Sequence, residues 1–319
     1  MNLMVKVSVI IPVYNGEKFI EKCINSILNG TYQNFELIVI NDGSKDNSLK
    51  VLKKFDKNKK IRIYSQKNHG ASYTRNIGLK KAIGKYVTFI DCDDYVEPDY
   101  LEQYIHAFKK NTNIVLGGYT KIIKNKRKTT KPSFCPWDVY RFSATCGKMY
   151  EKEFLEKNMI KYGNAEFLED VILNLNCLFK NANYEFINYA GYNYVYNADS
   201  ISNNYGRKPE QIINIFETIK YIDCLAHETG YNDSLYLINY YVNTYLFMVF
   251  ICCRKADYLF LKKNVNEFMN WLDTNYPEWK KKVNKIKGVE MFNKIVIFLW
   301  KGAYNIKLSN LLLYLYSKI

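Results

Sequence analysis

Apolar and polar positions alternate along the first third of the chain in the blocks expected of strands and helices. Five short apolar runs predict buried strands, and the segments between them carry apolar residues at helical spacing. A further helix is predicted to open at Pro98, because proline is favoured in the first helical turn. The predicted strands are Lys6–Pro12, Phe35–Ile40, Ile61–Ser65, Tyr86–Ile90 and Ile114–Gly118. The helices before Pro98 are Glu17–Leu28, a helix that has Asp46 as its N-cap and reaches about Phe55, and Ala71–Ala82.

This alternation predicts an α/β fold, in which helices cover both faces of a mostly parallel, Rossmann-like sheet. Beyond the fifth strand, the basic segment Lys121–Lys131 predicts a loop or an exposed hairpin. Phe167–Phe179 predicts a helix, and Tyr184–Tyr196 predicts two short strands. From about Pro209 onward the pattern is mainly helical, so we expect a second, helical region.

Polar residues follow three of the predicted strands at the point where each strand ends. They are Tyr14-Asn15, Asp42-Gly43 and Asp91 to Asp94. In an open parallel sheet, ligands bind beyond the carboxyl ends of the strands. We therefore expect these three segments to converge on one binding site.

The tripeptide Asp91-Cys92-Asp93 supplies two carboxylates directly after a buried strand. Hard divalent cations prefer carboxylate oxygens, and such a cation efficiently neutralises a departing diphosphate. If the segment is extended, both carboxylates point to the same side, so one can bind the metal while the other holds a ribose or a metal-bound water. An isolated Asp-x-Asp is usually a solvated turn, but its place after Tyr86–Ile90 disfavours that interpretation.

Three more polar or aromatic residues, Asp42, Tyr14 and Arg75, each have two interpretations. Asp42 either accepts a hydrogen bond from a pyrimidine N–H or a ribose hydroxyl, or is an ordinary turn residue. Tyr14 either stacks on a base or packs at the end of its strand. Arg75 either binds a pyrophosphate or is an exposed helix cation, and the neighbouring Asn76 predicts a buried hydrogen bond in both cases.

The net charge and the cysteine usage indicate the cellular compartment of the protein more than the reaction it catalyses. The net charge of +15 is compatible with a nucleic acid, an anionic membrane or a phosphorylated substrate as partner. The 8 Cys show no metal-ligand spacing, no secretory leader pattern precedes the first strand, and no run reaches the length of a spanning helix. We therefore expect a reduced, cytoplasmic setting.

Taken jointly, these motifs resemble glycosyltransferase family 2, inverting enzymes of the GT-A fold. The resemblance is specific over residues 5–120 and looser to about residue 205. It implies a bacterial enzyme of capsular or other cell-surface polysaccharide synthesis. The matching segments are Val9–Asn15, Val39–Asp46, Asn68–Gly78 and Phe89–Asp94.

The resemblance also implies a role for each matching residue. Asp42 would contact the nucleobase, and Asp91 the nucleotide. Asp93, with Asp91, would hold Mn²⁺ or Mg²⁺, and the donor would be a UDP-sugar. The full set of residues implied in donor binding is Pro12, Tyr14, Asn15, Asp42, Arg75, Asn76, Asp91 and Cys92.

The pair Glu169-Asp170 resembles the family's Glu-Asp pair at the start of a helix. Asp170 would then be the general base that deprotonates the acceptor hydroxyl, with Glu169 beside it in the catalytic site. The alternative is a capping pair that is favoured by the helix dipole.

The resemblance divides the chain into a GT-A catalytic domain, residues 1–205, and a helical C-terminal region, residues 206–319. Within the first, residues 1–120 would bind the donor and residues 121–205 would face the acceptor. Lysines from Lys280 to Lys307 recur among apolar and aromatic residues, which is typical of a helix lying on an anionic membrane. A lipid-linked saccharide acceptor at the inner face of the cell membrane would explain this tail. The alternative is a helix packed on the catalytic domain or in a homodimer interface.

Two other functions fit parts of the pattern. A non-catalytic basic protein that binds membrane or nucleic acid would explain the charge, but not carboxylates at successive strand ends. A nucleotidyltransferase would carry a Gly-rich basic phosphate loop after the first strand, where this chain has Pro12–Gly16. We therefore expect a peripheral membrane enzyme and no nucleic-acid partner.

Overall fold

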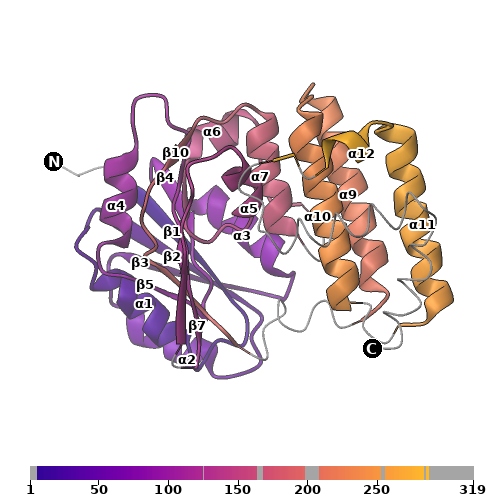
Figure 1. The fold of residues 1–319 in the computed structure, drawn as a ribbon. Helices are drawn as coiled ribbons and strands as arrows, with labels where there is room; N and C mark the ends of the chain where they lie inside the picture. The colour runs from indigo at the N-terminus through magenta and orange to yellow at the C-terminus, as the bar shows by residue number, and fades with distance from the viewer. Residues whose placement is uncertain are drawn as a thin grey trace. The chain divides into compact units, whose positions relative to one another are not determined.

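The computed structural model divides the chain into two compact units, and each is described separately. The first unit contains Met1–Phe134 and Phe142–Asn197, and the second contains Cys135–Arg141 and Ala198–Ile319. Figure 1 shows strands and helices in the first unit and long helices in the second. The residues that the structure describes are 6–124, 126–163, 168–197, 208–252, 256–283 and 285–286.

A seven-stranded sheet lies at the centre of the first unit, in the order β10-β6-β9-β4-β1-β2-β3. Its strands pair in parallel except β9, which runs antiparallel to both of its neighbours, β4 and β6. The prediction of a mostly parallel sheet is thus confirmed. The strands are β1 (Val7–Val13), β2 (Phe35–Asp42), β3 (Ile61–Gln66), β4 (Tyr86–Phe89), β6 (Ile114–Leu116), β9 (Lys148–Glu151) and β10 (Tyr184–Phe186).

Alternate side chains of these strands enter two apolar cores, one on each face of the sheet. Val9 and Ile11 of β1 pack in one core with α1, α2 and α4, whereas Ile10 packs in the other with α3, α6 and α7. Figure 1 shows these helices on the two sides of the sheet. Their bounds are α1 (Ile20–Leu28), α2 (Ser48–Leu52) with the 3-10 turn η1 (Lys53–Phe55), α3 (Ala71–Lys81), α4 (Tyr100–Ala107), α6 (Lys152–Lys157) and α7 (Glu169–Phe179).

A second, smaller sheet carries the basic segment of the first unit. Its four strands lie in the order β5-β11-β7-β8, and β7 and β8 form an antiparallel hairpin. The interpretation of Lys121–Lys131 as an exposed hairpin is therefore confirmed over its described residues. The strands are β5 (Tyr95–Val96), β7 (Tyr119–Ile123), β8 (Lys126–Thr130) and β11 (Tyr192–Val195).

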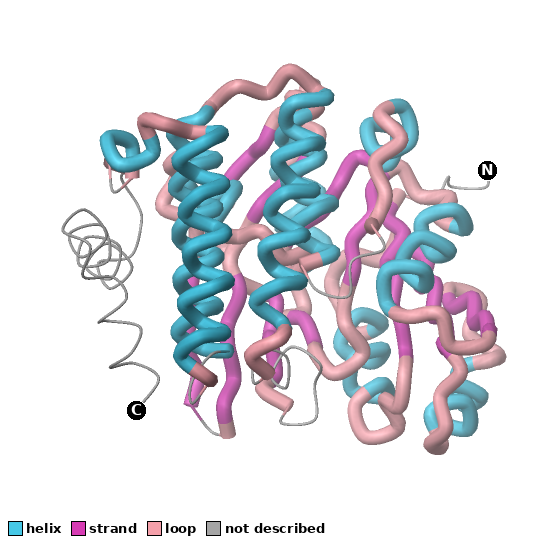
Figure 2. The backbone as a smooth tube through the Cα atoms, turned by 90° about the vertical axis from the view of Figure 1, so that its right-hand side faces the viewer, coloured by secondary structure: helices cyan, strands magenta, loops and turns pink. Residues whose placement is uncertain are grey.

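The described part of the second unit is helical, as the sequence predicts from about Pro209, and Figure 2 shows it as helices joined by loops. Tyr241 and Tyr245 of α10 are fully buried, in keeping with a core helix. None of the helices described is long and apolar enough to cross a bilayer. The helices of this unit are α5 (Trp137–Arg141), α9 (Gln211–Glu228), α10 (Ser234–Cys252), α11 (Tyr258–Asn275) and α12 (Trp279–Lys282).

Two sequence expectations need comment. Pro98 does not open α4: the helix begins at Tyr100 with Asp99 at its N-cap, and Pro98 lies in the preceding turn, where its carbonyl accepts a hydrogen bond from Thr31 N at 2.9 Å. The basic, amphipathic tail lies almost entirely outside the described residues, which end at Ile286.

Candidate functional site

The carboxyl ends of β1, β2 and β4 lie at the same edge of the sheet. The strands pair in parallel, with Val13 of β1 opposite Asn41 of β2 and Ile10 of β1 opposite Phe89 of β4. The three polar segments that follow these strands are thereby brought to one edge, as the alternating pattern predicts.

The segment after β1 is tied to the segment after β2 by Asn15. Its backbone N–H donates to Ser44 Oγ at 3.0 Å, and its side-chain oxygen accepts from Lys45 N at 2.8 Å. Asn15 has a φ of 51°, a conformation that asparagine tolerates better than most residues. The neighbouring Tyr14 is 43% exposed, so its ring is accessible to a ligand, whereas Pro12 lies within β1 opposite Ile40.

Asp42 fixes the segment that precedes α3. Its carboxylate is only 3% exposed and accepts hydrogen bonds from Gln66 Nε2 at 2.8 Å, His69 N at 2.9 Å and Gly70 N at 2.8 Å. The next residue must be glycine, because Gly43 has a φ of +68° and a Cβ there would lie 2.7 Å from Asn68 N. Because the carboxylate of Asp42 accepts three hydrogen bonds from the chain itself, its first role is to fix the conformation of this segment.

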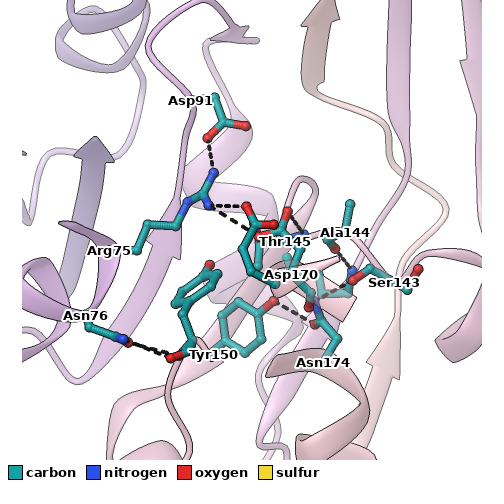
Figure 3. A network of polar contacts seen from close by, with 12 residues as sticks. Arg75, Asn76, Asp91, Ser143, Ala144, Thr145, Tyr150, Asp170 and Asn174 are labelled. Carbon is teal, nitrogen blue, oxygen red and sulfur yellow. Dashed lines mark hydrogen bonds and ion pairs between the residues drawn. The ribbon is translucent and has the colours of Figure 1, made fainter. Parts of the chain in front are cut away.

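Arg75 lies at the centre of a cluster of carboxylates. It is 6% exposed, and its guanidinium contacts Asp91 at 2.7 Å, Glu169 at 3.1 Å and Asp170 at 3.5 Å, as Figure 3 shows in part. Burial alone would lower the pKa of this guanidinium, but the surrounding carboxylates raise it well above its ordinary value. The end of β4 and the start of α7 are thus joined by one permanently charged group.

Glu169 and Asp170 form the first turn of α7, and Leu168 before them adopts a left-handed conformation with a φ of 63°. The Oδ2 atom of Asp170 accepts a hydrogen bond from Thr145 N at 3.3 Å. Its Oδ1 atom is buried and accepts no hydrogen bond from the described residues, with only the Arg75 ion pair near it. Burial, followed by the charge of Asp170, raises the pKa of Glu169 despite the opposing effect of Arg75.

Residues Asp91 to Asp94 form a turn, closed by a hydrogen bond from Asp94 N to Asp91 O at 3.0 Å. The expectation of an extended segment is therefore wrong, because the chain turns between β4 and β5. Asp91 and Asp93 nevertheless remain close enough to interact: burial first, and then the charge of Asp91, raise the pKa of Asp93 to about 6. A carboxylate whose ionisation is opposed by burial and by a neighbouring carboxylate is suited to a cation.

The other two residues of this turn face inward. The thiol of Cys92 packs against Gly16, and burial, followed by the charges of Asp93 and Asp91, raises its pKa, so it stays protonated. Asp94 is 2% exposed and accepts hydrogen bonds from Tyr192 Oη and Val195 N, both at 2.7 Å. The sequence analysis missed this role of Asp94, which fixes β11 to the end of β4.

Asn76 lies apart from the carboxylates. Its amide donates to the backbone oxygen of Tyr162 and accepts from the backbone nitrogen of Tyr162, each at 2.9 Å. This is the buried hydrogen bond that the sequence predicts at this position. It fixes the segment before α7 rather than pointing at Arg75, as Figure 3 shows.

The described residues provide carboxylates that can bind a divalent cation, but they do not provide a complete set of ligands. Within the described part of the chain, no three His, Cys, Asp or Glu side chains are grouped so that they hold a metal. Asp91 and Asp93 provide hard oxygen ligands, so they fit Mn²⁺ or Mg²⁺ only when a ligand such as a diphosphate supplies further oxygens. The donor set therefore fits a metal that binds together with a nucleotide.

Comparisons with known proteins show the family of the chain. The family model "Glycosyl transferase family 2" matches residues 8–173, just over half of the chain. Glycosyltransferase GlyA of Streptococcus pneumoniae is 43% identical over 116 residues, which are 36% of this chain and 17% of GlyA. The putative glycosyltransferase EpsH of Bacillus subtilis is 28% identical over 220 residues, 63% of this chain and 64% of EpsH. The chain thus covers less than two thirds of the length of either relative.

Solved structures share the fold at low sequence identity. Residues 1–349 of S. aureus TarS in complex with UDP-GlcNAc match with a TM-score of 0.73 at 19% identity, over 96% of this chain and 89% of that one. The mannosyltransferase PcManGT from Pyrobaculum calidifontis, in complex with GDP-Man and Mn²⁺, matches with a TM-score of 0.54 at 14% identity, over 95% and 87%. These matches confirm the expected fold class.

Proposed function

The chain belongs to glycosyl transferase family 2, and we propose that it transfers a sugar from a UDP-sugar to an acceptor hydroxyl with inversion at the anomeric carbon. One observation supports this most directly. Arg75 joins Asp91, at the end of β4, to Glu169 and Asp170, at the start of α7. A candidate donor-binding carboxylate and a candidate base, 79 positions apart in the sequence numbering, therefore meet around one buried cation.

The donor would bind at the carboxyl edge of β1, β2 and β4. The exposed ring of Tyr14 offers a surface on which the base stacks, and Asp91 offers a carboxylate to the ribose. Asp42 would reach the base through a lone pair not used by its three internal donors. UDP is favoured as the nucleotide because the TarS structure of the same fold holds UDP-GlcNAc.

Asp93, with Asp91, would hold Mn²⁺ or Mg²⁺ together with the donor's diphosphate. When bound, the cation would supply neutralisation of the charge that develops on the departing diphosphate. The raised pKa of Asp93, about 6, supports this assignment, since a carboxylate that is costly to ionise gains most from a cation.

Asp170 would act as the general base through Oδ1, the buried oxygen that accepts no hydrogen bond from the described residues. The acceptor hydroxyl would give its proton to this atom while its oxygen forms a bond to the anomeric carbon. The bond from that carbon to the diphosphate oxygen breaks in the same step, and its electron pair leaves with UDP. Thr145 N holds Oδ2, so the carboxylate cannot easily rotate away.

The basic tail leads to a second part of the proposal, the place of the reaction. Lys280, Lys281 and Lys282 lie at the end of the described chain, and lysines and apolar residues alternate beyond it. Each lysine near an anionic surface contributes about 1 kcal/mol of membrane attraction. We therefore place the protein at the cytoplasmic face of a membrane, with a lipid-linked saccharide of a cell-surface polysaccharide as acceptor. Deleting residues after Lys287 should then weaken binding to anionic vesicles, and unchanged binding would exclude the tail as the anchor.

Release of UDP from UDP-GlcNAc, UDP-glucose and UDP-galactose, with Mn²⁺ present, tests the activity. Asp170→Asn should lower turnover about 10² to 10⁴-fold, the contribution of a general base, while UDP still binds. Glu153→Gln is the matched control, because Glu153 also lies in the first turn of a helix, α6, but is exposed. Equal turnover in wild type and Asp170→Asn would show that the carboxylate pair only caps α7.

A further inference from the structure

The ammonium of Lys148 is a buried charge of the first unit that the proposed reaction does not use. Lys148 is the first residue of β9, has no exposed surface, and donates hydrogen bonds to the backbone oxygens of Phe142 and Ala144. Among the described residues, no carboxylate lies within ion-pair distance of its Nζ atom. Burial lowers the pKa of this ammonium to about 8, so keeping a lysine here is costly.

The Ala144–Thr145 peptide connects this ammonium to the candidate base. The carbonyl of Ala144 and the N–H of Thr145 belong to one planar trans peptide group, so they point in opposite directions. The carbonyl accepts from Lys148, and the N–H donates to Asp170 Oδ2 at 3.3 Å. A group that fixes the carbonyl on one side therefore aims the N–H at Asp170 on the other.

Asn174 holds the same loop from the side of α7. Its amide nitrogen donates to Ser143 O and to Asp170 O, each at 2.7 Å, and its oxygen accepts from Tyr150 Oη at 2.8 Å. Figure 3 shows Ser143, Ala144 and Thr145 beside Asp170 and Asn174 of α7. Asn174 thus fixes the loop Phe142–Thr145 through Ser143 O, and Lys148 fixes it through Phe142 O and Ala144 O.

We propose that Lys148 is a positioning residue for Asp170, acting through the Ala144–Thr145 peptide. By orienting that peptide, Lys148 keeps Oδ2 of Asp170 engaged with Thr145 N, so that Oδ1, which has only the Arg75 ion pair near it, is the oxygen that takes the acceptor proton. The inference rests on the role of Asp170 in the proposed function, but the structural link from Lys148 to Thr145 N can be tested without any turnover.

The structural link is tested by the amide proton shift of Thr145 in ¹⁵N-labelled protein. Asp170→Asn identifies the shift change that accompanies loss of the carboxylate acceptor. Lys148→Met removes the ammonium at similar side-chain length and should move the Thr145 signal in the same direction, whereas the exposed Lys128→Met should not. Lys148→Gln keeps an N–H donor and should return the signal toward the wild-type position. A Thr145 signal that stays unmoved in Lys148→Met would overturn the proposal.

The functional consequence is tested by turnover of the UDP-sugar that wild type uses fastest. Lys148→Met should lower kcat by about 10-fold to 100-fold, which is the usual effect of losing a residue that orients a functional side chain, and the KM for the donor should stay unchanged. In an Asp170→Asn background the same change should cost nothing further, because both act through one carboxylate. If Lys148→Met does not fold, judged by circular dichroism, Lys148→Gln is carried through the same double-mutant comparison.

Two failures are distinguishable. A loss that adds fully to that of Asp170→Asn, or that falls on KM alone, would overturn the role of Lys148 and leave the proposed function standing. Full turnover in Asp170→Asn itself would instead remove Asp170 as the base, and the role of Lys148 in catalysis with it.

Discussion

Replacing Asp93 by asparagine should stabilise the metal-free protein, although we expect the same change to abolish metal-dependent nucleotide binding. The carboxylate of Asp93 is partly buried and lies beside Asp91, and both effects oppose its ionisation. Asparagine has the same size and carries no charge. The variant therefore measures how much the charged carboxylate at this position lowers the free energy of unfolding.

The magnitude follows from the shift in pKa. The pKa of Asp93 rises from 3.8 to about 6 on folding. A pKa that is higher by about 2 in the folded state corresponds to a loss of roughly 3 kcal/mol of stability, and partial exposure to solvent makes this an upper limit. Because the folded state binds the proton more tightly, the penalty is absent below pH 3.8, grows between pH 3.8 and 6, and is complete above pH 6.

Thermal unfolding in EDTA measures this penalty. At pH 7.5 the Asp93→Asn variant should unfold at a Tm several degrees above wild type, since about 1 kcal/mol moves the Tm of a domain of this size by roughly 2–4 °C. At pH 4.5 most of the gain should disappear. Asp46→Asn is a control of opposite sign, because hydrogen bonds from Ser48 and Glu17 outweigh burial and lower the pKa of Asp46.

The reasoning is refuted if Asp93→Asn lowers the Tm in EDTA at pH 7.5, or if its effect is the same at both pH values. Either result would mean that the ionised carboxylate of Asp93 stabilises the folded protein through contacts within the chain. Asp93 would then be a structural residue, and not one that lowers stability in order to bind a cation.

Three further changes test the contacts around the site by urea unfolding. Arg75→Met leaves its three carboxylates without their shared cation and should destabilise the protein by about 3–5 kcal/mol at pH 7.5, with partial recovery at pH 5 as carboxylates take up protons. Gly78→Ala places a Cβ 2.3 Å from Ile10 Cγ2 and should cost about 1–3 kcal/mol, and the double variant with Ile10→Ala should cost less than the sum of the two single changes. Asp94→Ala removes the acceptor of Tyr192 Oη and should cost about 1–3 kcal/mol, whereas an Asn variant that is no more stable than Ala would contradict that contact.

The first unit's architecture could be predicted from the sequence because its central strands are buried on both faces. A mainly apolar run such as Phe35–Ile40 in β2 is recognisable without knowledge of its partners, and helices between such runs imply parallel pairing. The antiparallel β9 was not predicted, since its four residues, Lys148–Glu151, include two charged side chains and lack the expected apolar run.

The sequence predicted which residues form the candidate site better than it predicted how they contact one another. Carboxylates at strand ends are visible in sequence, but the ion pairs of Arg75 with Glu169 and Asp170 join residues 94 and 95 positions apart, and local patterning carries no signal for them. Lys148 could have been singled out as a charged residue beside the apolar Met149, yet nothing in the sequence indicates that its ammonium would meet Ala144 O.

The most direct test of the central claim is calorimetric titration of UDP, with GDP and CMP as controls, in the presence and absence of Mn²⁺. We predict that UDP binds wild type in a Mn²⁺-dependent manner, binds Asp170→Asn equally well, and loses this dependence in Asp93→Asn. Absence of binding by any nucleotide to folded wild-type protein, or undiminished Mn²⁺-dependent binding by Asp93→Asn, would contradict the assignment of this edge of the sheet as a metal-assisted donor site.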